Sequence, residues 1–476
     1  MSTIKLYSGG TIPVEMHRVT TVHNIRLIPI EERIKALDEA GNCSYNLRAD
    51  DVFIDMLTDS GFNAMSDEQA AAFHLADYAY AGGAGYYRMA DKVREILGKE
   101  YFLPVHQGRA CENMLAKSFV KKGDLIPTNF HFCTFATQVG LQGAEVVEFL
   151  QEKGMVTGGT DGFKGDYDLE KLEKFLSETP RERVPFVRIE AGTNLIGGQP
   201  ISMDNINSVA EIAHRHGVKT LLDMSLVMDN LHYIRVRDEK RKDKTVREII
   251  REMADAADII YFSGRKLGFA RGGGICMNDK ADFLTVRGNV SCFEGFPSFG
   301  GMSSAELEVM RVGFDDTMNA DVISQGPDFI GYMVDEFTKR GVPVVTPAGG
   351  LGCHLDADRF CDHLGKKEFR AAALAAAIYV ISGVRGMERG LSSEKPEESI
   401  CPFELVRLAV PRRVYTLSHI MYVIDRVTWL YEHREMIGAM RWEDESKEEH
   451  SFIDFLRPVN DWREKLAEEF KKAGLE

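Results

Sequence analysis

Two side chains that could act together on a cofactor follow strand-like segments in the middle of the chain. Asp223 ends the run Val218–Asp223, and Lys266 comes just after the run Asp258–Ser263, 43 residues beyond Asp223. Open parallel sheets bind ligands beyond the carboxyl ends of their strands, so both positions are candidates for chemistry. An aspartate can pair with a pyridinium nitrogen, and a lysine can form a Schiff base. Together, in this order, they indicate a site for pyridoxal phosphate (PLP), although each alone is more often a strand cap or a surface charge.

Two further segments offer what such a cofactor requires. The segment His106–Asn113 opens a predicted helix directly after the strand-like run Tyr101–Val105, and the backbone amides of a helix N-terminus can bind phosphate. A plain strand-to-helix turn explains this segment equally well when it is taken alone. Phe132 could lie flat on a pyridine ring, although an aromatic residue in an apolar run is more often simply part of the core.

Short β-branched runs alternate with segments of helical period between about residues 100 and 280. This rhythm is typical of βαβ units and predicts an α/β fold with a mostly parallel sheet. The clearest strands are Val184–Glu190, Val218–Asp223, Asp258–Ser263 and Gly274–Met277, and the clearest helices are Met203–His216 and Thr245–Ala256.

A second, α+β domain is predicted where longer helical patterns begin, at about residue 311. It includes the strand-like run Val342–Pro347 and helices at Phe369–Ile381 and Ser418–Ile437. The first sixty residues have weak periodicity and several turn signals, so we expect them to wrap onto a domain or a partner subunit. The predicted division is residues 1–58 as an N-terminal arm and part of the small domain, 59–310 as the large PLP-binding domain, and 311–476 as the small C-terminal domain.

The bulk composition excludes several classes of protein. A formal net charge of −15 would repel a nucleic-acid backbone, so nucleic acid is not expected as a partner. The eight cysteines form no C-x-x-C pair or Cys/His cluster, which argues against a disulfide framework and a structural metal. No stretch holds the roughly 18 apolar residues of a membrane helix, and the N-terminus lacks a signal-peptide pattern. We therefore expect a cytoplasmic protein that does not bind membranes and has no structural zinc site.

Seven segments are spread in order over nearly the whole chain. They are Leu57–Gly61, Ala79–Gly82, His106–Arg109, Thr193–Pro200, Glu294–Pro297, Met387–Gly390 and Val406–Tyr415. These segments resemble the tyrosine phenol-lyase and tryptophanase family of PLP enzymes. The resemblance implies the type I fold, with a seven-stranded, mostly parallel sheet in a large domain and a smaller α+β domain. It also implies a homo-oligomer, a dimer of dimers with active sites at the subunit interfaces.

The resemblance also assigns the residues that would hold the phosphate and the face of the cofactor ring. Gln107, Gly108 and Arg109 would cradle the phosphate with help from Ser263, and Phe132 would stack on the ring.

The same resemblance assigns the residues that would tune the cofactor. Asn194 would hydrogen-bond the 3'-oxygen, and Asp223 would keep the ring nitrogen protonated. Lys266 would hold PLP as a Schiff base and then remove the substrate α-proton, two tasks that suit a desolvated lysine of lowered pKa.

The substrate would meet a further set of residues by the same resemblance. Arg407 would bind the α-carboxylate in a bidentate fork, with Thr58 and Asn194 assisting. Tyr80, which the family contributes from a neighbouring subunit, would act as general acid on the leaving group. Arg389 matches a position that tyrosine phenol-lyases use near the phenol hydroxyl. Taken singly, Arg407 is more often a strand-edge ion pair and Tyr80 a half-buried aromatic residue.

Five positions depart from the family pattern. Leu226 replaces an arginine that stabilises the 3'-oxygen anion, so we expect altered cofactor electronics. Arg265 replaces the lysine that precedes the cofactor lysine and cannot give up its proton. Cys133 and, in a looser alignment, Ser451 change the leaving-group pocket. Tyr78 replaces an acidic residue that helps to bind a monovalent cation, which leaves K⁺ dependence open.

The leading hypothesis is a PLP-dependent lyase of the tyrosine phenol-lyase type that eliminates the β-substituent of an L-amino acid, expected to be aromatic, and yields pyruvate and ammonia. A second hypothesis keeps the fold but changes the reaction to transamination or to elimination from an S-substituted cysteine. A third is a PLP-binding protein that has lost turnover.

Overall fold

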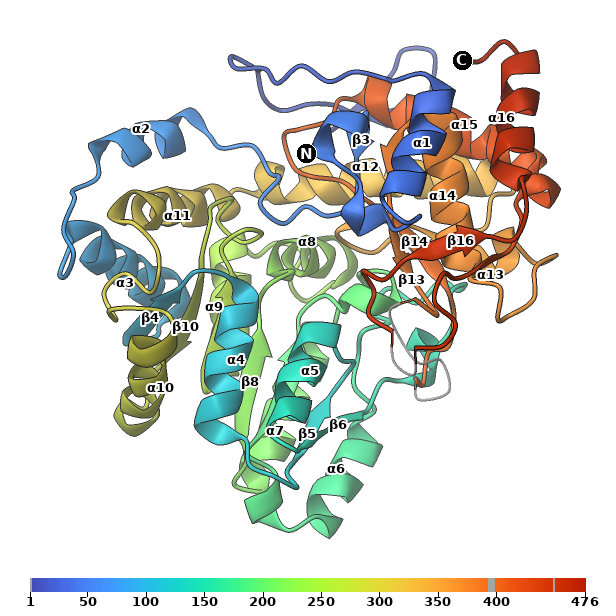
Figure 1. Ribbon diagram of the computed structural model, residues 1–476. Coiled ribbons are helices and arrows are strands. Elements are labelled where there is room, and N and C mark those ends of the chain that lie inside the picture. The colour runs from blue at the N-terminus through green and yellow to red at the C-terminus, as the bar shows by residue number, and fades with distance from the viewer. Residues whose placement is uncertain (1, 393–398, 448–449) are drawn as a thin grey trace. The chain divides into compact units, whose positions relative to one another are not determined.

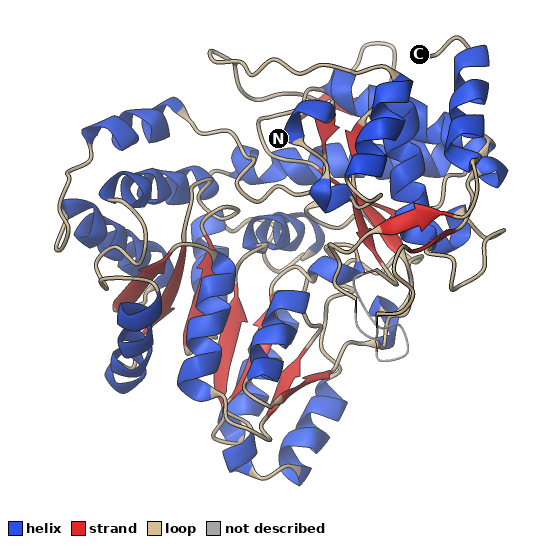
Figure 2. Cartoon of the chain, viewed as in Figure 1, coloured by secondary structure: helices blue, strands red, loops and turns tan. Residues whose placement is uncertain are grey.

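The computed structural model describes residues 2–392, 399–447 and 450–476 of the 476-residue chain (Figures 1 and 2). Two compact units divide the chain. Unit 1 comprises residues 60–155 and 161–324, and unit 2 comprises residues 2–59, 156–160 and 325–476. Within the described ranges, no helix combines the length and the apolar character needed to cross a membrane.

Unit 1 is built on a seven-stranded sheet. Its strand order is β4-β10-β9-β8-β7-β5-β6, and β5 to β9 run parallel, whereas β10 is antiparallel to both of its neighbours. Because β4 and β9 are each antiparallel to β10, the carboxyl ends of all the other strands meet at one edge. The strands are β4 (Tyr101–Val105), β5 (Leu125–Thr128), β6 (Glu145–Glu148), β7 (Phe186–Glu190), β8 (Lys219–Asp223), β9 (Ile259–Ser263) and β10 (Gly273–Met277).

Helices cover both faces of this sheet, because successive strand residues bury alternate faces. In β9, Ile259 and Tyr261 join one apolar cluster, and Ile260 and Phe262 join the other. The first cluster includes residues of α4 (Gly108–Phe119), α5 (Cys133–Leu141) and α10 (Lys280–Phe293). The second includes residues of α3 (Ala84–Leu97), α6 (Leu169–Glu178), α7 (Met203–Arg215), α8 (Val227–Arg237), α9 (Val246–Asp255) and α11 (Ser304–Thr317).

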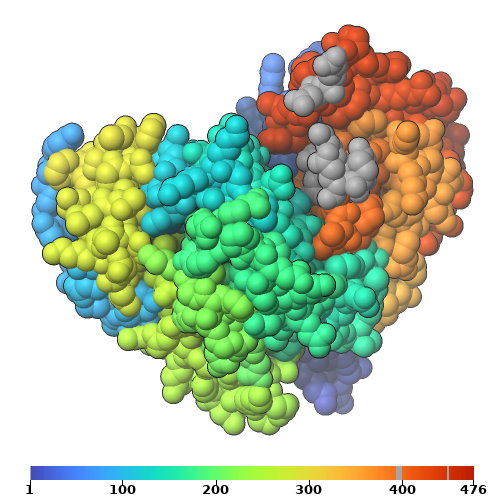
Figure 3. Space-filling model, turned by 90° about the horizontal axis from the view of Figure 1, so that it is seen from below, coloured from blue at the N-terminus to red at the C-terminus, as the bar shows by residue number. Residues whose placement is uncertain are grey.

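Helix starts in unit 1 are set by local sequence. Ser202 caps α7 by accepting from the backbone N–H of Asn205 at 3.3 Å, and Thr245 and Glu248 form a reciprocal capping box at the start of α9. Helix α2 (Asp67–Leu75) and helix α3 both pack against α11. In Figure 3 this part of the chain is coloured blue (α2 and α3) and yellow (α11).

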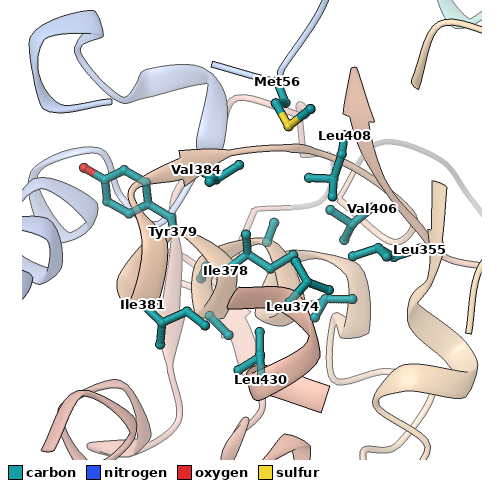
Figure 4. Close-up of a cluster of buried hydrophobic side chains, with 14 of the residues drawn as sticks. Met56, Leu355, Leu374, Ile378, Tyr379, Ile381, Val384, Val406, Leu408 and Leu430 are labelled. Carbon is teal, nitrogen blue, oxygen red and sulfur yellow. The ribbon is translucent and has the colours of Figure 1, made fainter. Parts of the chain in front are cut away.

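Unit 2 packs helices against a three-stranded antiparallel sheet of order β11-β14-β13. The strands are β11 (Gly352–Asp356), β13 (Met387–Arg389) and β14 (Leu405–Ala409). The almost entirely buried helix α14 (Arg370–Ser382) lies at the centre of the core, as Figure 4 shows. Around it lie α1 (Ile30–Glu39), α13 (Ala357–Phe360), α15 (Leu417–Glu432), α16 (Trp462–Lys472) and the later part of α12 (Ala320–Lys339).

Three two-stranded sheets complete unit 2. They pair β1 (Thr3–Lys5) with β2 (Thr11–Pro13), β3 (Ile54–Asp55) with β12 (Val384–Arg385), and β15 (Met440–Trp442) with β16 (Leu456–Pro458). The strand predicted at 342–347 is wrong, because Val344 forms only an isolated bridge to Leu355. The two prolines of that run, Pro343 and Pro347, cannot donate backbone hydrogen bonds to a ladder.

Candidate active site

The carboxyl-end edge of the unit 1 sheet carries the residues predicted to bind a cofactor. Each follows or ends one of five strands. They are Gln107, Gly108 and Arg109 after β4, Phe132 after β5, Asn194 after β7, Asp223 at the end of β8, and Ser263 and Lys266 at and after β9. A parallel sheet binds ligands at this edge, so their common location fits a cofactor site.

The N-terminus of α4 and the end of β9 form a narrow cradle. A Cβ atom placed on Gly108 would lie 2.9 Å from Cβ of Ser263, so only glycine lets the helix approach the strand this closely. The adjoining Gln107 bridges to Gly272, and its side chain does not cap the helix. Uncapped amides at the start of a twelve-residue helix, beside the Ser263 hydroxyl, suit a phosphate group. Arg109 is exposed in this first turn.

Asp223 is buried, with only 5% of its surface exposed, and its carboxylate has charged and polar partners. Its Oδ2 accepts from Nη2 of Arg188 and from the Tyr261 hydroxyl, each at 2.7 Å, and its Oδ1 accepts from the backbone N–H of Ser225 at 2.8 Å. Cross-strand register accounts for this arrangement, because Glu190, Asp223 and Tyr261 lie directly opposite one another on β7, β8 and β9.

Asn194 is linked to the same buried group. Its backbone N–H donates to Oε1 of Glu190 at 3.1 Å, and Oε2 of Glu190 accepts from Nη1 of Arg188 at 3.0 Å. The residues predicted to bind the 3'-oxygen and the ring nitrogen are therefore joined through Glu190 and Arg188. Burial is the main cause of the raised pKa of Glu190, and the cationic Arg188 opposes it.

A tight turn holds Lys266 just past β9. Its backbone N–H donates to the Ser263 carbonyl at 3.2 Å, and Gly264 bonds to Gly272 at 2.8 Å. The side chain of Lys266 is half-buried. The carbonyl of the preceding Arg265 accepts from the backbone N–H of Gly61 at 3.2 Å, which fixes the turn from outside the sheet.

Phe132 is half-buried and occupies the residue before α5, where Cys133 begins the helix. The loop that leads to it is fixed by Asn129, whose amide donates to the carbonyls of Gly165 and Glu190, each at 3.0 Å. The departure at Leu226 is buried as well, and a Cβ on Gly192 would lie 2.9 Å from Cβ of Leu226. An apolar side chain packs closely here, at a position where the resemblance predicted an arginine.

Unit 2 contains Arg407 and Thr58, two of the three residues predicted to bind the substrate carboxylate. Arg407 lies in the central strand β14, is 6% exposed, and donates through Nη2 to the carbonyl of Leu57 at 2.7 Å. Thr58 is the next residue after Leu57 in the chain. Strand alternation separates an apolar core face, which carries Val406 and Leu408 (Figure 4), from the opposite face with Arg407.

The polar face of this sheet also carries Arg389 and His354. His354 lies directly opposite Arg407 on β11, and Arg389 lies two residues beyond the partner of Arg407 on β13. Arg389 is 2% exposed and donates to the carbonyls of Cys401 at 3.0 Å and Phe403 at 3.3 Å. Burial, followed by the positive charges of Arg407 and Arg389, lowers the pKa of His354 to about 3, so the imidazole is neutral at pH 7.

Tyr80 and Tyr78 lie on the surface of unit 1. Tyr80 is 79% exposed and Tyr78 is 96% exposed, and the Tyr80 ring packs near Phe296 and Phe299, with ring centroids 6.1 and 5.4 Å away. The Tyr80 ring therefore lies beside the Glu294–Pro297 segment of the same unit. Ser451 donates its backbone N–H to Oδ2 of Asp454 at 2.8 Å.

Comparison with known proteins places this site in a family. The family model described as beta-eliminating lyase matches residues 55–426. The chain belongs to the beta-eliminating lyase family. It is 38% identical to the tyrosine phenol-lyase of Lacrimispora saccharolytica over 437 residues, which cover 90% of this chain and 93% of that one. It is 37% identical to the tyrosine phenol-lyase of Fusobacterium nucleatum over 442 residues, which cover 92% and 96%.

Solved structures support the fold of this family member. Serine palmitoyltransferase of Sphingomonas wittichii superposes with a TM-score of 0.60 and 15% identity, covering 86% of this chain and 97% of that one. The predicted type I fold and the PLP-dependent β-eliminating lyase are confirmed, and the alternative reaction is not favoured.

Sequence reasoning missed four buried polar residues beside the predicted ones: Glu112, Arg188, Glu190 and Tyr261. A signal for two of them was present in the run Val184–Glu190, where Arg188 and Glu190 interrupt an otherwise apolar segment. Central parallel strands are usually continuous apolar runs, so charges within one call for a buried partner.

Proposed function

We propose that this β-eliminating lyase acts on an aromatic L-amino acid, with L-tyrosine as the first candidate, and releases the ring as leaving group together with pyruvate and ammonia. The placement of Asp223 and Lys266 after the adjacent parallel strands β8 and β9 carries the proposal for the chemistry. The names of the relatives at 38% and 37% identity support the choice of tyrosine.

The residues of unit 1 fit PLP. Gln107, Gly108, Arg109 and Ser263 would hold the phosphate in the α4 cradle, Phe132 would cover the ring, and Asn194 and Asp223 would bind its polar atoms. The fit rests on the close approach of Gly108 to Ser263, because a side chain at residue 108 would fill the cradle. When bound, PLP supplies an electron sink for the charge that builds up on the substrate α-carbon.

Lys266 would bind the cofactor covalently and would then, as a neutral amine, take the proton from the substrate α-carbon. Asp223 would hold the ring nitrogen through its remaining Oδ1 lone pair. Arg407, supported by Thr58 and Asn194, would bind the substrate carboxylate with a planar guanidinium that matches two oxygens at once.

Tyr80 would donate a proton to the departing carbon of the ring, and Arg389 would select the ring hydroxyl. The 79% exposure of Tyr80 within one chain supports its delivery to the site of a neighbouring subunit. We therefore propose a homo-oligomer, a dimer of dimers with active sites at subunit interfaces. A monomeric mass at assay concentration would contradict this arrangement.

Two finer features belong to the same proposal. The eight free cysteines support a reducing, cytoplasmic location. Exposed Tyr78 offers no carboxylate to a cation, so we propose that activity changes little when K⁺ is replaced by a tetraalkylammonium ion.

The test is pyruvate release by the PLP-loaded protein from L-tyrosine, L-tryptophan and an S-alkyl-L-cysteine. The S-alkylcysteine carries an easy leaving group, so it separates the elimination chemistry from aromatic specificity. Pyruvate from tyrosine, abolished in Lys266→Ala without added amine, is the expected result. Pyruvate from S-alkylcysteine alone would overturn the aromatic substrate and would point to another leaving group at the Cys133 side of the site.

A further inference from the structure

A buried network underlies Asp223 and spans three strands of unit 1. Arg188 on β7 is fully buried and contacts two carboxylates, Glu190 on its own strand and Asp223 on β8. Tyr261 on β9 donates to Asp223 at 2.7 Å and accepts from Nε of Arg188 at 3.1 Å. The Arg188 guanidinium also lies 4.5 Å from the centre of the Phe135 ring. The position of the guanidinium is thus fixed by contacts on several sides.

The hydrogen-bond partners of Asp223 leave it with limited remaining capacity. A carboxylate offers about four lone-pair sites. Among the described residues, Oδ2 accepts two bonds, from Arg188 and Tyr261, and Oδ1 accepts one, from Ser225. One site on Oδ1 remains, which matches the single N–H of a pyridinium ring.

The charges of the network also call for one more cation. Arg188 is one cation between the two carboxyl groups of Glu190 and Asp223. Tyr261 adds no charge, because burial raises its pKa well above the ordinary range. Glu112 on α4 adds little at pH 7, because burial and then the charge of Asp223 raise its pKa to about 8. Its Oε2 accepts from the Thr134 hydroxyl of α5 at 2.5 Å. Two buried carboxyl groups that share one guanidinium leave room for a second cation, and a pyridinium beside Asp223 would supply it.

We propose that Arg188 is a positioning residue that stabilises the charged pair of ionised Asp223 and pyridinium over the neutral pair of carboxylic acid and pyridine. The inference rests on the proposed PLP site. In a buried setting the neutral pair is a real competitor, because both charges of the ion pair lose hydration. A cation against the carboxylate, on an oxygen other than the one left for the ring, favours the ion pair.

The network also bears on the departure at Leu226. The resemblance predicted an arginine at that position, whereas the side chain here is apolar and buried. Arg188 supplies a cation whose hydrogen bonds reach Asp223 directly and Asn194 through Glu190. Arg188 thus connects Asp223, which would bind the ring nitrogen, with Asn194, which would bind the 3'-oxygen.

The test uses the double variant R188Q/E190Q, loaded with PLP labelled with ¹⁵N in the ring. Replacing Glu190 together with Arg188 avoids leaving a buried Glu190 carboxylate without its cation, and Asp223 keeps its bonds from Tyr261 and Ser225. The ring ¹⁵N chemical shift reports where the proton resides, independently of turnover. Wild type should show a pyridinium, and the double variant should move measurably toward pyridine, with PLP bound about tenfold more weakly.

Three further variants make the result specific. Arg188→Lys keeps the charge and should retain the pyridinium shift. Tyr261→Phe removes one hydrogen-bond donor to Asp223 without changing the charge, so the ring ¹⁵N shift should move toward pyridine by less than in the double variant. This variant provides the test if the double variant does not fold. Glu112→Gln, a matched buried control, should leave the shift at pH 7 unchanged.

A double variant that folds and binds PLP with the wild-type ¹⁵N shift would overturn the proposal for Arg188. Wild-type protein that does not bind PLP covalently at Lys266, judged by borohydride reduction and peptide mass, would instead overturn the proposed cofactor site. The two failures are therefore distinguishable.

Discussion

Replacing Gly108 with alanine should weaken PLP binding without weakening the fold. The added methyl group would lie 2.9 Å from Cβ of Ser263, whereas carbon atoms pack best about 3.5–4.0 Å apart. Helix α4 or Ser263 must therefore move by roughly 0.6–1 Å, which displaces the amide and hydroxyl donors from the phosphate.

The magnitude follows from the kind of bond that is lost. A hydrogen bond to a charged group contributes about 1.5–3 kcal/mol, so the loss of one corresponds to a dissociation constant raised about 10- to 150-fold. The assay is PLP titration monitored by the visible absorbance of the bound cofactor, with thermal unfolding of the apoprotein measured in parallel.

Gly288 provides the matched control. It lies inside α10, where an added Cβ would meet nothing within 4 Å. Gly288→Ala should bind PLP as wild type does and should stabilise the helix by up to about 1 kcal/mol. If Gly108→Ala bound PLP with the wild-type affinity, the cradle between α4 and β9 would not be the phosphate site.

Three other predictions concern single residues. Arg407→Met should lower kcat/KM about 10- to 150-fold, mainly by raising KM. Arg407→Lys should have an intermediate kcat/KM, because lysine keeps the charge but cannot make the two parallel hydrogen bonds of a guanidinium. If Arg407→Met had the KM of wild type in steady-state assays, Arg407 would not bind the carboxylate. His354 has a pKa of about 3 in the folded protein, so it stays neutral there, whereas the unfolded chain takes up a proton below about pH 6.5. On acidification from pH 6.5, the free energy of unfolding of wild type should therefore fall by about 1.4 kcal/mol per pH unit more than that of His354→Phe, as measured by urea unfolding. Parallel curves for the two proteins would contradict the burial of a neutral imidazole. Glu112 has a pKa of about 8 in the folded protein and keeps its proton there, whereas the unfolded chain releases it above about pH 4.5. The free energy of unfolding of wild type should therefore fall relative to that of Glu112→Gln between pH 5 and 8. If the difference between the two free energies did not change with pH, Glu112 would be ionised in the fold.

Much of the unit 1 sheet could be predicted because its strands and helices have strong periodic patterns. The strand expected at Asp258–Ser263 is β9, from Ile259 to Ser263, and the helix expected at Thr245–Ala256 is α9, from Val246 to Asp255. The apolar run at 342–347 was wrongly predicted as a strand, because its apolar content outweighed the two prolines, which lack the backbone N–H groups that a strand needs.

The candidate site also contains some residues that the sequence could reveal and others that it could not. Asp223 and Lys266 could be found from sequence because each follows a recognisable strand. The partners of Asp223 could not, since Arg188 and Tyr261 reach it only through the lateral order of β7, β8 and β9, which no local pattern encodes. His354 was missed for the same reason, because its position opposite Arg407 depends on the register of β11 with β14.

The most direct test of β-elimination is the fate of the carbon chain of the substrate. The PLP-loaded protein would be incubated with L-tyrosine labelled with ¹³C throughout, and the products would be followed by NMR. β-Elimination predicts equal amounts of labelled phenol and pyruvate, with none formed by Lys266→Ala. A labelled 2-oxo acid that retains the aromatic ring would show transamination and would contradict it.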